Sequence, residues 1–186
     1  LGYKLDGLTD PNDNDRKYDF KDSFMVTEEG KTFVAVWVPI KVGMKFRGGE
    51  GAEGEMPNQI AEFDSWTKLN ECTYTKEGCK LLGWKHGDDY YLPETEVKVK
   101  VAEYGDFMEF DAVWIEENRN PGDVNGDGIV DLMDLTMLSM HIVGDSEIKD
   151  EKALDDADVQ RDGKVDIADL ARLRQFLMQD KILLGV

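Results

Sequence analysis

The sequence predicts a multi-module protein in which a β-rich repeat region precedes a small all-α module of two loop-helix units. Two internal repeats lead to this fold class. In the C-terminal third, DVNGDGIVDLMDLTML at 123–138 recurs as DVQRDGKVDIADLARL at 158–173, 35 residues later. In the N-terminal part, GYKLDGL at 2–8 recurs as GCKLLGW at 78–84, and FVAVW at 33–37 recurs as FDAVW at 110–114.

The N-terminal repeat has a period of 76 to 77 residues and strand-like patterning. TFVAVWV at 32–38 and EVKVKV at 96–101 alternate in the manner of half-buried strands. The segment VGMKFRGGEGAEGEMPN at 42–58 begins a unit whose first copy has no such start in this sequence. We therefore expect residues 1–37 to be the latter half of one repeat, residues 38–117 a complete repeat, and residues 118–186 the α module, as the end of a larger bacterial protein.

Both C-terminal loops carry oxygen-bearing side chains at positions 1, 3, 5, 9 and 12 of a twelve-residue loop. They are Asp123, Asn125, Asp127, Asp131 and Asp134 in the first loop, and Asp158, Gln160, Asp162, Asp166 and Asp169 in the second. Calcium binds about 6 to 8 oxygen ligands, and such a loop adds a backbone carbonyl from position 7. Ile129 and Lys164 hold that position. We predict one calcium ion in each loop, two in all.

Position 6 of each loop requires a sharp turn, and Gly128 and Gly163 stand there. The alternative is two acidic surface turns that bind no metal. Agreement at so many positions, in two loops, favours the metal sites. Gln160 departs from the pattern, since Asn or Asp is usual at position 3. Its longer amide is expected to weaken the second site or to place a water between ligand and ion.

Two features separate these loops from an ordinary EF-hand: position 12 is Asp, and Pro121 with Gly122 prevents a helix from entering the first loop. Residues 120–182, with GDVNGDG at 122–128, resemble the dockerin family. The resemblance implies binding to a cohesin module of a scaffoldin or cell-surface anchor through loop positions 10, 11, 17 and 18. These positions are Leu132, Met133, Ser139 and Met140 in one repeat, and Ile167, Ala168, Arg174 and Gln175 in the other.

Each helix after a loop has an apolar stripe at helical spacing. The stripes are Leu135, Leu138 and Ile142 in the first helix and Leu170, Leu173 and Leu177 in the second. We expect the two stripes to face each other. About sixty residues with two short helices bury little surface, so ion binding should supply much of the folding free energy, and the metal-free module should be largely unfolded.

The first helix also carries Met133, Met137 and Met140 away from that stripe. They either pack against the preceding module or form a partner surface, and the dockerin resemblance favours the partner surface. The two predicted contact sets differ strongly in residue type. This asymmetry predicts one dominant binding mode, through the first helix.

The N-terminal repeats resemble the Listeria and Bacteroides surface repeat of the internalin B-repeat type. The shared features are a strand, a Gly-Gly turn, Met56-Pro57, the sequence TKEG, Gly83-Trp84 and a closing AVW. The resemblance implies a β-grasp-like fold and a role as spacer or adhesive module. Before a dockerin, it gives an arrangement like an X-module followed by a dockerin.

The aromatic and cysteine residues of the repeats leave two further choices open. Trp37, Trp84 and Trp114 could stack on sugar, but their fixed repeat positions favour core packing; Trp66 lies outside that pattern. Cys72 and Cys79 flank an expected hairpin turn and are predicted with equal weight as a disulfide or as two small thiols.

No catalytic constellation is evident, so we predict that the chain is not an enzyme. His86 and His141 are too far apart in sequence to suggest a zinc pair, and no Ser or Cys has an evident base beside it. Among 40 acidic residues, no two stand out as an acid and base pair.

The formal net charge of −18 makes nucleic acid an unfavourable partner. No apolar run approaches the roughly 20 residues of a membrane span. We expect a secreted or cell-surface protein, monomeric apart from its cohesin complex.

Two functions remain. The first is a calcium-dependent cohesin-binding module that incorporates its parent protein into a cellulosome-like complex for polysaccharide degradation. The alternative is a calcium-stabilised surface adhesin whose repeats bind a carbohydrate, host or cell-wall ligand.

Overall fold

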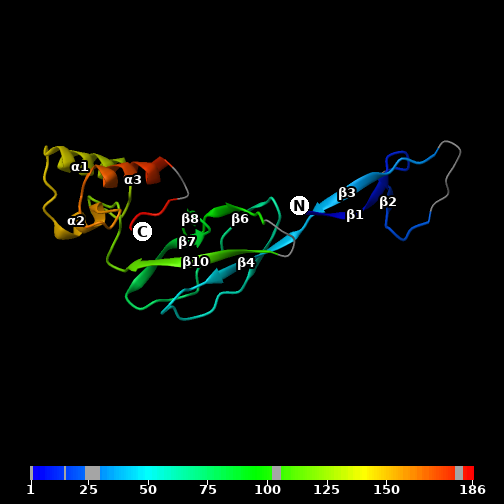
Figure 1. The fold of residues 1–186 in the computed structure, drawn as a ribbon, viewed down its shortest axis with the longest axis horizontal. Coiled ribbons are helices and arrows are strands. Elements are labelled where there is room, and N and C mark those ends of the chain that lie inside the picture. The colour runs from blue at the N-terminus through cyan, green and yellow to red at the C-terminus, as the bar shows by residue number, and fades with distance from the viewer. Residues whose placement is uncertain (1, 15, 24–29, 102–105, 179–181) are drawn as a thin grey trace. The chain divides into compact units, whose positions relative to one another are not determined.

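The structure is a computed structural model that describes residues 2–14, 16–23, 30–101, 106–178 and 182–186. Ten strands precede three helices among these residues. The strands are β1 (Tyr3–Asp10), β2 (Arg16–Tyr18), β3 (Val34–Pro39), β4 (Lys41–Arg47), β5 (Gln59–Glu62), β6 (Trp66–Lys68), β7 (Cys79–His86), β8 (Asp89–Tyr91), β9 (Glu96–Lys98) and β10 (Phe107–Glu116). The helices are α1 (Leu132–Val143), α2 (Glu151–Ala157) and α3 (Ile167–Met178), shown in Figure 1.

The chain divides into two compact units that are discontinuous in sequence. The first comprises Leu1–Met44, Asn58–Thr67 and Lys98–Met108. The second comprises Lys45–Pro57, Lys68–Val97 and Glu109–Val186, and so includes all three helices together with β7, β8 and most of β10.

The strands form sheets in the orders β2-β1-β3, β5-β4-β10-β7-β8 and β6-β9. The pairs β1 with β3 and β7 with β10 are antiparallel, and they repeat each other in detail. Leu5 pairs with Trp37 and Gly7 with Val36; at offsets of 76 and 77 residues, Leu81 pairs with Trp114 and Gly83 with Val113. Both ladders shift register between these two pairs, so the bulge repeats as well. The β-grasp-like family of these repeats stays a prediction.

An aromatic core lies within the second unit. Alternate residues of β4 are buried, and the last of them, Phe46, stacks on Phe110 of β10 with 5.5 Å between ring centroids. Trp84 of β7 meets the same Phe46 ring edge-on at 5.0 Å and is fully buried. The period-2 burial places these rings on one face, as alternation in the sequence predicts.

The tryptophans of the repeats do not share one environment. Trp84 is a core residue, as expected, and the Trp114 indole donates a hydrogen bond to the Gly48 carbonyl at 2.7 Å. Trp37 is 59% exposed, so the expectation of core packing is wrong for this residue in the structure. Its counterpart Trp114 is half-buried because β4 lies next to β10.

The cysteines are both free and half-buried in the structure. The Cys72 thiol lies 3.8 Å from the Tyr74 carbonyl oxygen. Burial raises the pKa of this thiol, since the low-dielectric surroundings disfavour the thiolate.

The helical region has its own core, centred on Leu138 of α1 and Leu173 of α3, which are both fully buried. Leu135, Ile142 and Leu170 pack against it, and Figure 1 shows α1 and α3 side by side. The expected contact between the two apolar stripes is therefore confirmed for these residues. At the end of α3, Phe176 packs against this core, and Leu177, the expected residue, is half-buried.

Helix α2 is an element that the sequence reading did not include. It begins after Asp150, whose carboxylate accepts a hydrogen bond from the Ala153 amide at 2.9 Å, and it ends directly before the second loop. The second loop therefore follows a short helix, whereas the first follows the turn at Pro121 and Gly122. Among the described residues, no helix is long and apolar enough to cross a membrane.

Replacing Phe110 by alanine is expected to lower the free energy of unfolding by about 3 to 5 kcal/mol, because the substitution empties the centre of the aromatic core. Urea unfolding followed by tryptophan fluorescence measures this change. Phe20→Ala removes an exposed ring and is the control, with an expected change within about 0.5 kcal/mol. Equal effects of the two substitutions would contradict the assignment of this core.

Candidate functional site

The first loop, residues 123–134, is folded around its own side-chain oxygens. The Asp123 carboxylate accepts hydrogen bonds from the amides of Gly126 at 2.8 Å and Gly128 at 3.0 Å. Asn125 Oδ1 accepts from the Asp127 amide, and Asp127 Oδ1 from the Ile129 amide, each at 2.8 Å. These short-range bonds hold the side chains of positions 1, 3 and 5 in a fixed order along the turn.

Asp134, at position 12, closes this loop from inside the module. Its side chain is fully buried. Oδ1 accepts from the amides of Val124 at 2.9 Å and Asn125 at 3.0 Å, and Oδ2 accepts from the Asp131 amide at 2.8 Å. Asp131 is the N-cap of α1 and forms a capping box with Asp134. One carboxylate therefore joins the start of the loop to the start of the helix.

The glycines at position 6 have the backbone conformation that the sequence predicts. Gly128 has φ of 88° and Gly163 has φ of 82°, both in the left-handed region that favours glycine. Position 4 is also left-handed, with φ of 75° at Gly126 and 58° at Arg161. The second loop thus holds a non-glycine residue in a conformation that is uncommon for one.

The second loop, residues 158–169, follows the same plan. The Asp158 carboxylate accepts from the amides of Asp162 at 3.1 Å and Gly163 at 2.9 Å. Buried Asp169 accepts from the amides of Gln160 at 3.1 Å and Asp166 at 2.9 Å. The position-12 carboxylate again connects the loop to the helix that follows.

The loops differ at position 3. Asn125 accepts a hydrogen bond from the residue two positions later, whereas the Gln160 amide donates from Nε2 to the Ala168 carbonyl at 3.0 Å. The extra methylene takes the glutamine head group across to the start of α3. The effect of Gln160 on calcium binding by the second loop stays a prediction.

The loop residues fit calcium by the chemistry of their donors. Each loop offers carboxylate and amide oxygens together with a position-7 carbonyl, and it contains neither cysteine nor histidine. Across residues 2–14, 16–23, 30–101, 106–178 and 182–186, no group of three or more His, Cys, Asp or Glu side chains is gathered into a cluster that could hold a metal ion. The ligand sets predicted from the sequence therefore stay predictions.

Comparison with known proteins bears on this region of the chain. Residues 121–178 match the Dockerin type I domain. Dockerin domains bind calcium and cohesin modules, and they occur in extracellular cellulosome proteins. Comparison with the curated proteins and with the solved structures finds no match to this chain.

The second loop of the dockerin domain is anchored by a buried arginine, Arg119, which is 6% exposed. Its guanidinium donates to the carbonyls of Asp155 and Asp158, the latter at 3.2 Å, and forms an ion pair with the Asp155 carboxylate. Asp158 is position 1 of the second loop, so this contact holds the loop at its first residue. Sequence reasoning missed Arg119, because a lone arginine next to a turn resembles an exposed charge.

Two further contacts reach the same loop. The Gly185 amide donates to the Val159 carbonyl at 2.7 Å, and the Arg161 guanidinium lies 3.2 Å from the Glu116 carboxylate at the end of β10. A hydrogen bond from its own backbone, together with that from Arg161, lowers the pKa of Glu116. The first, second and fourth positions of the second loop are thus each tied to chain segments outside the loop.

Residues 182–184 form an apolar strap that is buried in the second unit. Leu183 packs on β7 at Gly83, where an added Cβ would lie 2.9 Å from its Cδ1 atom. Leu184 packs on Gly122, where the corresponding distance is 2.6 Å. Larger residues at these two glycines would displace the strap, so both glycines permit a close approach.

Helix α1 presents an exposed apolar face. Leu132 is 70% exposed, Met133 60% and Met140 41%. They share one side of the helix with Val143, and Met137 lies at its border. The exposure of the methionines favours the partner surface over packing against the preceding module.

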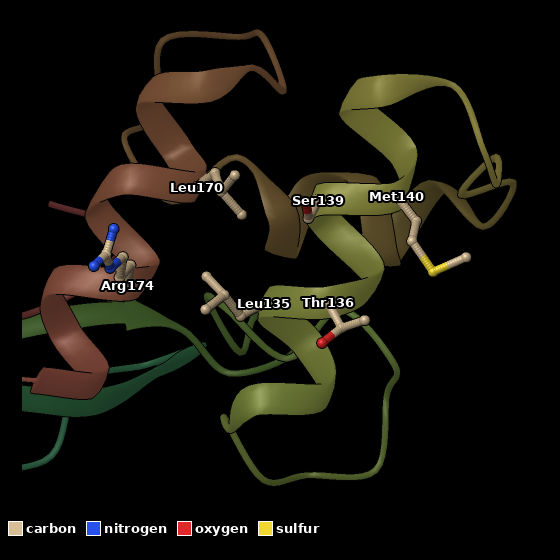
Figure 2. Close-up of a pocket in the computed structure, with 6 residues that line it drawn as sticks. All are labelled: Leu135, Thr136, Ser139, Met140, Leu170 and Arg174. Atoms are coloured by element: carbon tan, nitrogen blue, oxygen red, sulfur yellow. The ribbon is translucent and has the colours of Figure 1, made fainter.

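Helix α3 supplies the other predicted contact set. Ile167, Arg174 and Gln175 are exposed, and Ala168 is half-buried, as is Ser139 of α1. A hollow of about 310 Å³ lies between the two helices. Figure 2 shows its lining residues, which are Leu135, Thr136, Ser139, Met140, Leu170 and Arg174. The hollow brings Ser139 and Met140 together with Arg174, so predicted contacts of both repeats border one surface.

Replacing Gln160 by asparagine is expected to tighten calcium binding by the second loop about fivefold to tenfold, because one hydrogen bond across the turn is worth about 1 kcal/mol. Calorimetric titration of the full chain with calcium measures the change. Asn125→Gln is the reciprocal control and should weaken the first loop by a similar factor. Unchanged affinities in both variants would contradict the role assigned to position 3.

Replacing Arg119 by alanine is expected to destabilise the dockerin domain by about 2 to 4 kcal/mol, because the partly buried carbonyls of Asp155 and Asp158 lose their charged donor. Urea unfolding followed by the helical circular dichroism signal, in saturating calcium, measures the loss. Arg174→Ala removes an exposed arginine and should change stability by less than about 0.5 kcal/mol.

Proposed function

We propose that this chain is a non-catalytic, calcium-dependent assembly module. Its dockerin domain binds a cohesin on a scaffoldin or cell-surface anchor and so incorporates the parent protein into a cellulosome-like extracellular complex. The observation that carries the proposal is the pairing of two structurally equivalent loops with an exposed apolar face on the helix that follows the first loop.

Calcium supplies positive charge to loops that otherwise concentrate carboxylates. Its ligands are the two sets named from the sequence, with the Ile129 and Lys164 carbonyls at position 7. Hydrogen bonds within the chain support this role. Loop amides orient the carboxylates of Asp123 and Asp158. Asp134 and Asp169 accept hydrogen bonds from their loops and so link each loop to the helix that follows it. Ion binding therefore favours the packed helices, and removal of the ions unfolds the domain.

The cohesin contacts lie mainly on α1. Leu132, Met133 and Met140 offer a large exposed apolar area, whereas the matching positions of α3 include Arg174 and Gln175. Apolar contact supplies most of the affinity in such interfaces, so α1 outweighs α3. The different chemistry of the two faces supports a single dominant binding orientation.

The β-rich part serves as spacer and stabiliser. Within the second unit, β10 leads directly to Arg119, and β7 receives Leu183 of the strap. The sheet thus stabilises the dockerin domain through the second loop and the C-terminal residues. The high negative charge disfavours nucleic acid and self-association, which agrees with a secreted, monomeric protein.

The double substitution Met133→Asp and Met140→Asp in the full chain is expected to weaken cohesin binding at least about a hundredfold, since two carboxylates would be placed against an apolar partner surface. Calorimetric titration with a panel of cohesins, with calcium and again with chelator, measures this. Met178→Asp changes an exposed methionine of α3 outside both predicted contact sets and is the matched control.

Calcium-dependent binding that persists in the double variant would move the interface to α3. If calcium still raises the helical content but no cohesin binds, the assembly role is contradicted and the adhesin function remains. Binding of a polysaccharide or cell-wall ligand to the repeats would then support that function.

A further inference from the structure

The first loop contains an asparagine followed by a glycine, Asn125-Gly126, and the sequence has no other such pair. This order of residues permits a reaction with the backbone, because the amide nitrogen of the glycine follows the asparagine directly and has no Cβ beside it to obstruct an approach. The second loop has Gln160 and Arg161 at the same positions. A glutamine would have to close a larger ring, onto a nitrogen next to a bulky side chain, so the two loops differ in this chemistry.

The reaction is the loss of ammonia from the Asn125 carboxamide. The Gly126 nitrogen forms a bond to Cγ of Asn125, the bond from Cγ to Nδ2 breaks, and the amide proton leaves with Nδ2 as ammonia. The product is a cyclic succinimide. Water then opens the ring at either of its carbonyls and leaves aspartate or isoaspartate. Water is the only other reactant, and nothing is oxidised or reduced.

Three hydrogen bonds of the folded loop hold the atoms that must react. The Gly126 amide donates to the Asp123 carboxylate at 2.8 Å. Both ends of the Asn125 carboxamide bind Asp127: Oδ1 accepts from its amide at 2.8 Å, and Nδ2 donates to its carboxylate at 2.9 Å. Ring closure takes the Gly126 nitrogen and the departing Nδ2 amine out of these bonds, so the folded loop opposes the reaction.

Burial gives this pair little protection. Gly126 is exposed, Asn125 is half-buried, and a Cβ added to Gly126 would meet no atom within 4 Å. Water and the space for a ring are therefore available once the hydrogen bonds open. The resistance of Asn125 to this reaction thus depends on whether the loop is folded.

We propose that Asn125 is a deamidation site that the folded first loop protects, and that its isoaspartate product prevents this loop from forming again. Isoaspartate adds a methylene to the backbone between two bonds that fix the start of the loop, from the Asn125 amide to Asp134 and from the Gly126 amide to Asp123. Both bonds depend on the original spacing of their donors.

The dependence of this protection on calcium rests on the proposed function, in which removal of the ions unfolds the domain. A period without calcium then exposes Asn125 to the reaction, and the product remains after calcium returns. The helix that follows this loop is α1, which carries the main proposed cohesin contacts, so the modification acts on the half of the domain that binds the partner.

The test follows Asn125 in the full chain at neutral pH in calcium, in chelator and in urea, by peptide mapping with mass spectrometry. Conversion should be at least about tenfold slower in calcium than in urea, because a folded chain reacts only through its open fraction. Gln160 and Asn120 are internal controls and should stay intact, the latter because Pro121 has no amide proton. In urea, Gly126→Ala should react at least about fivefold more slowly, since its Cβ hinders ring closure.

Helical circular dichroism in chelator separates this proposal from the proposed function. If chelator unfolds the domain, Asn125 should react there as fast as in urea. If the domain stays folded without calcium, the calcium dependence of the proposed function is contradicted, whereas Asn125 should still react more slowly in chelator than in urea.

The isoaspartate chain, separated by chromatography, tests the effect of the product. Its helical signal should be lost at a lower urea concentration than that of the fresh chain, and calcium should bind its first loop at least about tenfold more weakly. Asn125→Asp has the charge of the product with an unaltered backbone and should retain binding. Equal conversion in calcium and in urea, or an isoaspartate chain as stable as the fresh one, would overturn the proposal.

Discussion

Each half of the dockerin domain depends on one buried carboxylate at the end of its loop. Asp134 and Asp169 lie out of water, where an ionised group is unstable without close partners. Backbone amides from the loop start and from the last loop turn provide those partners. Because the same residue belongs to the first turn of a helix, the bonds that close each loop also join it to the helix that carries Leu138 or Leu173 into the core.

The β-rich part contributes more than length. The same ladder of two strands occurs twice, but only the copy formed by β7 and β10 continues into the dockerin domain. Its end is joined to the second loop, which has glutamine at position 3 and the left-handed Arg161 at position 4. The β-rich part therefore contacts the dockerin domain at its second loop.

Sequence patterns predicted the loops and the facing helix stripes because both depend on contacts close along the chain. The loop bonds join residues two to ten positions apart, and the stripes follow from helical periodicity. Helix α2 was missed, since seven residues carry too few turns to show a stripe. Arg119, the strap and the exposure of Trp37 depend on residues distant in sequence, and local patterns carry no information about them.

The contacts that hold the second loop also define how the molecule would transmit a mechanical load. A pull between β10 and the α1 face would enter the domain at residues 116–122, which the Glu116 pair with Arg161, the Arg119 bonds and the Gly122 bond to Asp156 all join to residues 155–161. Bonds loaded in parallel share a force, whereas bonds loaded in series fail one at a time. The same contacts that stabilise the folded domain would therefore, under tension, resist shear between residues 116–122 and the segment they bind.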